Sequence, residues 1–253
     1  NIFFRGELGD SPQDYAFFPE SKVTKFEDMR IRAGKNDIRN PFLIDELMRR
    51  LFIGTGQQGS IGSFVSVYIN GVWKGYFNLC EHLREAFMQQ HHDSIATWDV
   101  QQVNAFASGD SIHWNKTIAF LRTNDLTVAA NYVGAQEYID TDNVIDYLTV
   151  YSFSACADWP NNNWVAARER SARGRWRYYM WDAEMSMGFT GRTTSYNTFT
   201  SDLIIANPKT STVYIPVIFT LLYASPEFRL RFADRIQKHF FNNGCFRRLL
   251  RPA

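Results

Sequence analysis

The sequence predicts an α+β fold, with a β-rich N-terminal part and a mostly helical C-terminal part. The first observation is the dipeptide Asn70-Gly71, which separates two β-rich runs in GSFVSVYINGVWKGYFNLCEHL and is the strongest short signal for a hairpin. The second is the helical pattern that predominates from Asp110 onward. The chain has 253 residues, 45% of them hydrophobic, which is enough to bury a sizeable core as one large or two small domains.

The N-terminal elements follow in order along the chain. NIFFR has the composition of a strand end, residues 9–29 are rich in turn formers, and MRIRAG is typical of a short strand. A helix is expected next, with Asn40 as N-cap, Pro41 at the first helical position, FLIDELMRRLF as its body and Gly54 as its end. The hairpin follows this helix, and EHLREAFMQQHH after it is typical of another helix.

The C-terminal part is expected to consist of helices around a second hairpin. The hairpin has strands near 163–168 and 175–181. The expected helices are 111–123, 127–138, 142–155, 215–224 and 226–241.

Three segments result from this order of elements. Residues 1–80 form the N-terminal lobe, residues 81–244 the helical part with a polar segment at 158–184, and residues 245–253 an atypical basic tail. The chain opens without Met, directly on a strand-like run, so we expect it to be a fragment of a longer protein. The missing signal peptide therefore carries little information.

Charge and cysteine content disfavour several classes of function. The formal net charge is +1, so no strong field recruits nucleic acid or an anionic membrane. No apolar run approaches the about 18 residues that a membrane span requires. Cys80, Cys156 and Cys245 are far apart and form no CxxC pair, which argues against a zinc site and a disulfide framework and leaves a single bridge open.

The polar segment 158–184, DWPNNNWVAARERSARGRWRYYMWDAE, carries the candidate chemistry. Phosphoryl transfer needs a carboxylate for the attacking hydroxyl, an amide oxygen for a metal ion and a further carboxylate for metal. Protein kinases space the first two as D-x-x-x-x-N, as Asp158 and Asn163 are spaced here, and Asp182 follows in the same order. The alternative is a capped turn, in which Asp158 and the asparagines bond nearby backbone amides.

Four segments, in the same order, resemble the CotH kinase family, the spore-coat-protein-H-like secreted kinases. FEDMRIRAGKNDIRNPFLIDELMRRL is similar to the family's R-x-G-x-x-D element and following helix, and VYINGVWKGYFNLCEHLREAF to its hairpin. NVIDYLTVYSFSACADWPNNNW resembles the helix that leads into D-W-x-x-N-N, and GRWRYYMWDAEMSMG the W-D-x-D element. The resemblance covers residues 26–188 of 253.

The resemblance implies an atypical protein-kinase-like fold whose N-terminal lobe is truncated in this chain. It implies transfer of phosphate from ATP to protein hydroxyls with Mg²⁺ or Mn²⁺. The implied substrates are coat or surface proteins of bacteria, and the implied location is extracellular or at the cell or spore surface.

The motif match also assigns roles to four residues. Asp158 falls on the family's catalytic aspartate, Asn163 on its metal-binding asparagine and Asp182 on its metal-binding aspartate. Glu184 replaces the second aspartate of W-D-x-D, and it is either a metal ligand or a solvated residue. Hard cations prefer carboxylate and amide oxygens, so these residue types suit the implied metal.

Two glutamates are candidate nucleotide-binding residues. Glu46 lies on the first predicted helix, where it could pair with a phosphate-holding lysine, or it could be an exposed partner of Arg49 and Arg50. Glu81 ends the hairpin where a kinase hinge contacts adenine, or it caps the next helix.

The phosphate-holding lysine of the family lies on a strand in a K-K-S/T-like run, and this chain begins just after it. We therefore expect the fragment to transfer phosphate poorly unless Lys22, Lys25 or an arginine of the 168–177 patch replaces that lysine. A pseudokinase or structural surface module is the alternative function. A metal-dependent hydrolase using Asp182 and Glu184 is a third, although no histidine is near them in the sequence.

The sequence also predicts the surroundings of three further sets of charged or titratable residues. Arg32 and Asp37 are expected to form a structural salt bridge or turn cap. The adjacent His91 and His92 are expected to be solvated at a helix end. The arginines of the 168–177 patch are expected beside the site, where they bind phosphates or an acidic substrate, or to form a solvated hairpin turn.

Overall fold

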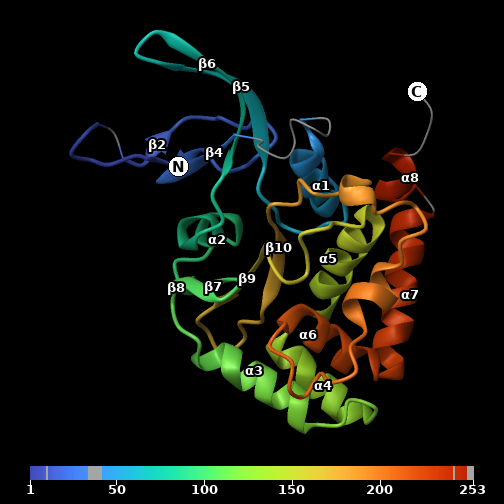
Figure 1. The fold of residues 1–253 in the computed structure, drawn as a ribbon. Coiled ribbons are helices and arrows are strands. Elements are labelled where there is room, and N and C mark those ends of the chain that lie inside the picture. Colours follow the sequence, from blue (N-terminus) through green and yellow to red (C-terminus); the bar gives the residue numbers. More distant parts are fainter. Residues whose placement is uncertain (10, 34–41, 242, 250–253) are drawn as a thin grey trace.

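Two four-stranded sheets organise the computed structural model, one in each half of the chain (Figure 1). The structure describes residues 1–9, 11–33, 42–241 and 243–249. The expected N-cap Asn40 with Pro41, and the expected salt-bridge partner Asp37, lie outside the described residues. Mixed helix and sheet confirms the α+β class predicted from the sequence.

The first sheet is antiparallel, with the strand order β1-β4-β6-β5. Its strands are β1 (Ile2–Phe3), β4 (Asp28–Arg32), β5 (Gly62–Ile69) and β6 (Val72–Glu81), and β2 (Gln13–Asp14) pairs separately with β3 (Lys25–Phe26). The predicted turn joins β5 to β6, with φ of 50° at Asn70 and 78° at Gly71. Both residues are left-handed, as a tight hairpin turn requires. This hairpin projects from the body of the molecule (Figure 1).

Helix α1 (Ile44–Gly54) links the two halves. It ends at the predicted glycine and begins two residues later than the predicted body. Its buried side chains Met48 and Phe52 belong to the same hydrophobic cluster as the C-terminal helices, and the ring of Phe52 lies 6.2 Å from that of Tyr147. The predicted N-terminal segment 1–80 therefore contributes a helix to the C-terminal core.

The second sheet has the order β10-β9-β7-β8 and is also antiparallel. The predicted hairpin of β9 (Trp164–Glu169) and β10 (Arg177–Met180) is confirmed. Two further strands, β7 (Trp98–Gln102) and β8 (Ala105–Ser108), were not predicted from the sequence. Their turn contains no glycine, and Val103 adopts φ of 52° there, which a β-branched residue seldom does. The C-terminal part is thus helices packed on a sheet.

The helices of this part lie within a few residues of their predicted positions. Helix α2 begins later than predicted, because Glu81 still belongs to β6. The central helix α5 is almost entirely buried, is capped by Asp140, and ends at Ala155 in a left-handed conformation. The bounds are α2 (Glu85–His91), α3 (Ile112–Thr123), α4 (Ala129–Tyr138), α5 (Thr141–Ser154), α6 (Tyr214–Tyr223) and α7 (Pro226–Phe240).

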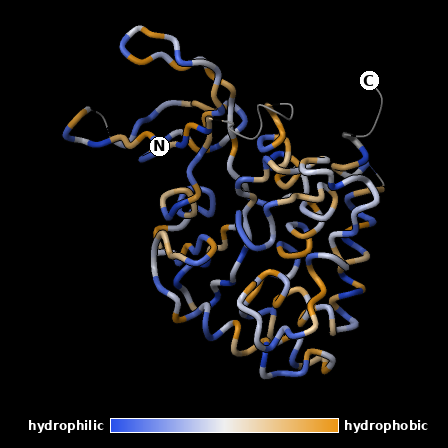
Figure 2. The backbone as a smooth tube through the Cα atoms, viewed as in Figure 1, coloured by the Kyte–Doolittle hydropathy of each residue, from blue (hydrophilic) through white to orange (hydrophobic). Residues whose placement is uncertain are grey.

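The predicted tail is partly structured. Residues Cys245–Leu249 form the short helix α8. Phe246 is fully buried, and its ring stacks on Phe240 at 4.5 Å. This hydrophobic contact places the start of the tail in the core, although its sequence is basic. Figure 2 shows hydrophobic residues spread along the helices that surround α5.

The three cysteines, Cys80, Cys156 and Cys245, are buried, and none of them forms a disulfide within the described residues. Burial raises the pKa of the Cys156 thiol to about 11. Within the described ranges, no helix combines the length and apolar character needed to cross a bilayer.

The expectation that His91 and His92 are solvated is wrong. Nε2 of His91 lies 2.8 Å from a carboxylate oxygen of Glu81, and the ring of His92 stacks on Trp98. Nε2 of His92 lies 2.8 Å from the hydroxyl of Tyr179. The end of β6 and the second sheet pack against this helix end. Its aromatic neighbours Trp98 and Tyr179 belong to a separate hydrophobic cluster, which shields both histidines from solvent.

This burial predicts a pH dependence of stability. Burial, and then the charge of Arg177, lower the pKa of His92 from 6.5 to about 4. As the pH falls from about 6.5 to about 4, the unfolded chain binds a proton there that the folded chain does not, so the free energy of unfolding decreases. The variant His92→Gln lacks this titrating group. Its free energy of unfolding should therefore fall less steeply than that of the unaltered chain as the pH decreases from about 6.5 to about 4. Denaturant titrations at several pH values measure the difference; parallel curves would contradict the assignment.

Candidate active site

The β9–β10 hairpin brings the two ends of the polar segment together. Trp164 pairs with Met180 in the ladder, so Asn163 and Trp181 stand next to each other at the same end. The hydroxyl of Tyr151 on α5 lies 3.0 Å from the backbone oxygen of Asn163 and 2.9 Å from that of Trp181, and its single proton is shared between the two acceptors. A buried tyrosine therefore fixes the point at which the segments before β9 and after β10 meet.

Both segments carry strained backbone at the residues that the sequence selected. Asn163 has φ of 58° and Asp182 has φ of 53°. A residue other than glycine in this region costs on the order of 1 kcal/mol and persists only where the surroundings hold it. Such strain concentrates at functional sites, and here it falls on two of the three residues that share the kinase-like order Asp158, Asn163 and Asp182.

Asp158 and Asn163 are in direct contact. Nδ2 of Asn163 donates to Oδ2 of Asp158 over 3.0 Å, and Nδ2 of Asn162 donates to Oδ1 over the same distance. The carboxylate is thus held by side-chain amides, where a simple capped turn would use backbone amides. Because Asn163 donates through its nitrogen, its amide oxygen takes no part in this bond. The buried Trp159 anchors the loop by stacking on Tyr151, with ring centroids 4.6 Å apart.

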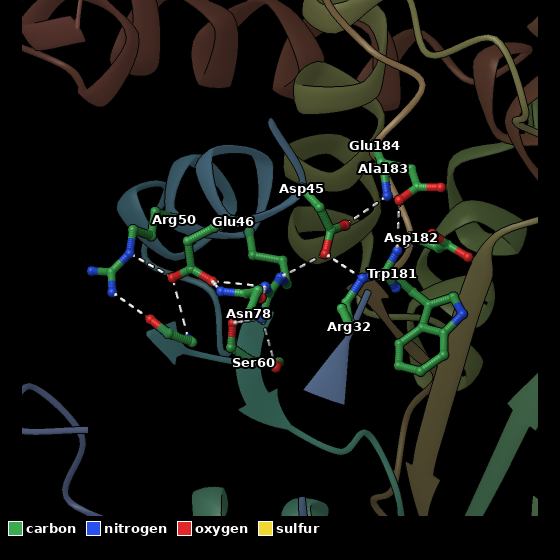
Figure 3. A network of polar contacts seen from close by, with 12 residues as sticks. Arg32, Asp45, Glu46, Arg50, Ser60, Asn78, Trp181, Asp182, Ala183 and Glu184 are labelled. Carbon is green, nitrogen blue, oxygen red and sulfur yellow. Dashed lines mark hydrogen bonds and ion pairs between the residues drawn. The ribbon is translucent and has the colours of Figure 1, made fainter. Parts of the chain in front are cut away.

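Asp182 and Glu184 converge on one guanidinium group (Figure 3). Nη2 of Arg32, at the end of β4, forms a short ion pair with Oδ1 of Asp182 and lies 3.3 Å from Oε2 of Glu184. The Asp182 side chain is 29% exposed and that of Glu184 11%, so Asp182 is the more accessible of the two. Arg32 thus forms ion pairs with residues about 150 positions away in the sequence, while its expected partner Asp37 lies outside the described residues.

Asp45 joins this group to helix α1. Its Oδ2 lies 3.1 Å from Nε of Arg32 and 3.3 Å from Nε of Arg49, and its Oδ1 accepts a hydrogen bond of 2.8 Å from the amide of Ala183. Burial raises the pKa of Asp45, but the charges of Arg49 and Arg32 lower it more, so the carboxyl stays ionised. The sequence analysis did not select Asp45, although it stands beside the selected Glu46.

The two candidate nucleotide-binding glutamates are buried and already have partners. Glu46 pairs with Arg49 at 2.7 Å and with Arg50 at 2.6 Å, as the alternative reading of its helix position expected, but it is not exposed. Oε2 of Glu81 accepts from the amide of Ile61 over 2.9 Å, and Oε1 faces His91. Glu81 does not cap α2, which begins at Glu85. A nucleotide-binding role for either glutamate stays a prediction.

The arginine patch is not beside the site, which corrects the expectation from the sequence. It occupies the opposite end of the hairpin, because β9 runs from Trp164 to Glu169 between the two. Arg168 donates to the backbone oxygens of Ser171 and Gly174 and so holds the turn, while Arg170 pairs with Asp99 at 2.6 Å.

One histidine comes closer than the sequence suggested. The ring of His82 stacks on Trp181, with centroids 6.3 Å apart, next to Asp182. Nδ1 of His82 lies 3.1 Å from a carboxylate oxygen of Asp28, and no described contact joins its ring to Asp182 or Glu184. A hydrolytic role for His82 gains no support from these contacts.

The donor set suits a hard divalent cation. It comprises the carboxylates of Asp182 and Glu184, which already share one positive group, and the amide oxygen of Asn163, whose nitrogen holds the carboxylate of Asp158. Over the described ranges, no group of three or more His, Cys, Asp or Glu side chains stands ready as a metal site. A cation bound here would therefore take the remaining ligands from water or phosphate oxygens, as Mg²⁺ commonly does.

Two large hollows in the described part of the chain lie away from this donor set. One of about 620 Å³ is lined by residues of α4, α5 and α7, including Asp142 and Arg231. Another of about 570 Å³ lies between residues 20–25 and the residues Ile61 and His91. None of Asp158, Asn163, Asp182 and Glu184 lines either of them. The site is a cluster of charged groups bridged by Arg32.

The role of Tyr151 can be separated from the general effect of a buried tyrosine. Tyr151→Phe should lower the free energy of unfolding by about 1–3 kcal/mol, because two backbone oxygens lose their donor. Tyr178→Phe is the matched control: its hydroxyl is buried and has no hydrogen-bond partner among the described residues, so its removal should be neutral or stabilising. Denaturant titration of both variants tests this, and equal losses would show that the two-oxygen contact does not hold the site together.

Comparison with known proteins supports the resemblance found in the sequence. The family model described as CotH kinase protein matches residues 13–247. A search of curated proteins finds no match. The family match extends well beyond the four motifs on which the resemblance was based, and it includes all the donor residues described above. The chain therefore belongs to the CotH kinase family.

Proposed function

We propose that the chain is the core of an ATP- and divalent-metal-dependent protein kinase that phosphorylates protein hydroxyl groups. The observation that supports this best is the convergence of Asn163 and Trp181 on the hydroxyl of Tyr151. It places the Asp158–Asn163 pair and the Asp182–Glu184 pair at the same end of one hairpin. Phosphoryl transfer needs these groups together, and it needs little covalent chemistry from the protein.

Each residue has a distinct role in this proposal. Asp158 accepts the proton of the attacking hydroxyl, while the γ-phosphoryl group passes to the substrate oxygen and leaves ADP behind. Asn163 and Asp182 would hold Mg²⁺ or Mn²⁺, with Glu184 as a further ligand. The metal, when bound, neutralises charge on the phosphates. Membership of the family also supports a protein substrate of the coat or surface type and a location at a cell or spore surface.

A second candidate is a pseudokinase or surface module that binds without catalysis. The observation in its favour is Arg32, which already neutralises the carboxylates that a metal would use. Breaking such a partly buried pair has a cost, which nucleotide and metal must offset. The two candidates differ in one measurement: transfer of labelled phosphate from ATP to a generic protein substrate. Binding of metal–ATP without transfer, by the chain and by an N-terminally longer version, favours the second.

We predict that Asp182→Asn weakens metal–ATP binding about tenfold to a hundredfold, because it removes charge from a direct ligand. Asp158→Asn should leave this affinity nearly unchanged but reduce transfer about a hundredfold or more, because it removes the proton acceptor. Isothermal titration calorimetry and labelled-phosphate transfer measure the two effects.

The matched control is Asp110→Asn. Asp110 is a partly exposed aspartate that pairs with Arg170 at the far end of the hairpin, so neither affinity nor transfer should change. Equal losses of affinity in Asp182→Asn and Asp158→Asn would contradict the assignment of roles. Melting curves without ligand establish that each variant is folded.

A further inference from the structure

Arg32 is the one cation in the described ion pairs that contacts the predicted metal-binding carboxylates. It ends β4, and its side chain is only 11% exposed. Its Nε faces Asp45 of α1, and its Nη2 faces Asp182 and Glu184. One guanidinium group therefore connects the first sheet, the helix that packs into the C-terminal core, and the acidic end of the β9–β10 hairpin.

The charges around Arg32 leave room for additional positive charge. The ion-pair network contains the carboxylates of Asp45, Glu46, Asp182 and Glu184. Its two buried cations are Arg32 and Arg49, and Arg50 lies at its edge with a 46% exposed side chain. Arg50 also pairs with Glu20. Within the described ion pairs, carboxylates thus outnumber guanidinium groups, even though Arg30 adds a further positive charge near Asp182 and Asp45, and this excess suits the approach of a divalent cation.

The two ends of the guanidinium group have different partners. If Asp182 and Glu184 bind a cation, they release Nη2, while the pair between Nε and Asp45 keeps the group in place. The burial of Arg32 lowers its pKa, but the charges of Asp45 and Asp182 raise it more, so the group stays charged. A fixed, planar, charged fork beside a metal ion is a suitable donor for phosphate oxygens.

We propose that Arg32 is the phosphate-binding cation of this chain and contacts the phosphates of ATP beyond the first. The inference rests on the proposed function, since it assumes that ATP binds at the Asp182 end of the hairpin.

The other basic residues considered as replacements are less suitable. Lys22 and Lys25 line the hollow that also contains Asp93, away from the site. The arginines of the 168–177 patch lie at the opposite end of the hairpin, and Arg168 holds the turn there. Arg49 is 3% exposed and is held by Asp45 and Glu46. These contacts leave Arg32 as the best placed of them.

The nearest competitor is Arg30, which provides a matched control. It lies two positions earlier on β4, so it shares the face of Arg32. Its guanidinium carbon lies 4.1 Å from the ring centroid of Trp181, and the group stacks on that ring. Because its guanidinium group is already engaged in this cation–π contact, Arg30 is not expected to bind phosphate.

The test compares the affinities of the chain for Mg²⁺–ATP and for AMP by calorimetry. Arg32→Gln should reduce the preference for Mg²⁺–ATP over AMP about tenfold to a hundredfold, because a charge-assisted contact to the outer phosphates is lost. Arg32→Lys should keep part of the preference, since it keeps the charge without the fork. Arg30→Gln should leave the preference unchanged. If Arg32 only holds the structure together, Arg32→Gln would weaken the binding of Mg²⁺–ATP and of AMP alike and leave the ratio of the two affinities unchanged. That result would overturn the inference.

Two further outcomes are distinguishable. If the unaltered chain binds neither Mg²⁺–ATP nor Mn²⁺–ATP, the proposed function fails and the inference with it; if it binds them and Arg32→Gln keeps the preference, only the inference fails. Arg32→Gln removes one ion-pair partner from each of three carboxylates, those of Asp45, Asp182 and Glu184, and could unfold the chain. The double variant Arg32→Gln/Glu184→Gln removes one of these charges, and its preference is then compared with that of Glu184→Gln. An unchanged preference in this comparison would also overturn the inference.

Discussion

The arrangement of the site depends on the interactions of one buried carboxylate, that of Asp45. One of its oxygens accepts from the amide of Ala183, and the other faces Arg32 and Arg49. Helix α1, strand β4 and the segment after β10 meet at this single side chain. A buried carboxylate is costly unless it is paired and hydrogen-bonded. Here Oδ1 has the hydrogen bond and Oδ2 has two ion pairs, so loss of one arginine would leave the charge only partly compensated. The positions of Asp182 and Glu184 relative to the first sheet follow from this contact.

The second constraint is the hairpin register, which acts on the other side of the site. Because Trp164 pairs with Met180, the two flanking segments must emerge side by side, and the hydroxyl of Tyr151 holds their backbone oxygens. The left-handed residues Asn163 and Asp182 then turn the chain away from the ladder. Strain at these positions is tolerated because the buried helix α5 and the sheet fix the backbone on both sides.

Helix α1 couples these two constraints. Its apolar face packs with the C-terminal helices, while its acidic residues reach the first sheet through Arg32, Arg49 and Asn78. A ligand that changes the partners of Arg32 therefore acts on a contact between the two halves of the chain. Binding at the acidic end of the hairpin and the relative stability of the two halves are linked for this reason.

The sequence by itself determined the elements whose signals are local. Asn70-Gly71 specified one hairpin, and the order of Asp158, Asn163 and Asp182 pointed to the loop and the hairpin end that the structure places side by side. The turn at Val103 gave no such signal, because its left-handed residue is neither glycine nor asparagine, so β7 and β8 were missed. The tertiary structure alone decided the partners of the charged residues. Asp45 reaches Ala183 across 138 positions, and Arg32 reaches Asp182 across 150. The arginine patch lies close to Asp182 in sequence, yet a strand length separates it from the site. Charge pairing depends on distance in space, and only the packing of α1 and β4 against the hairpin brings those groups within reach of one another.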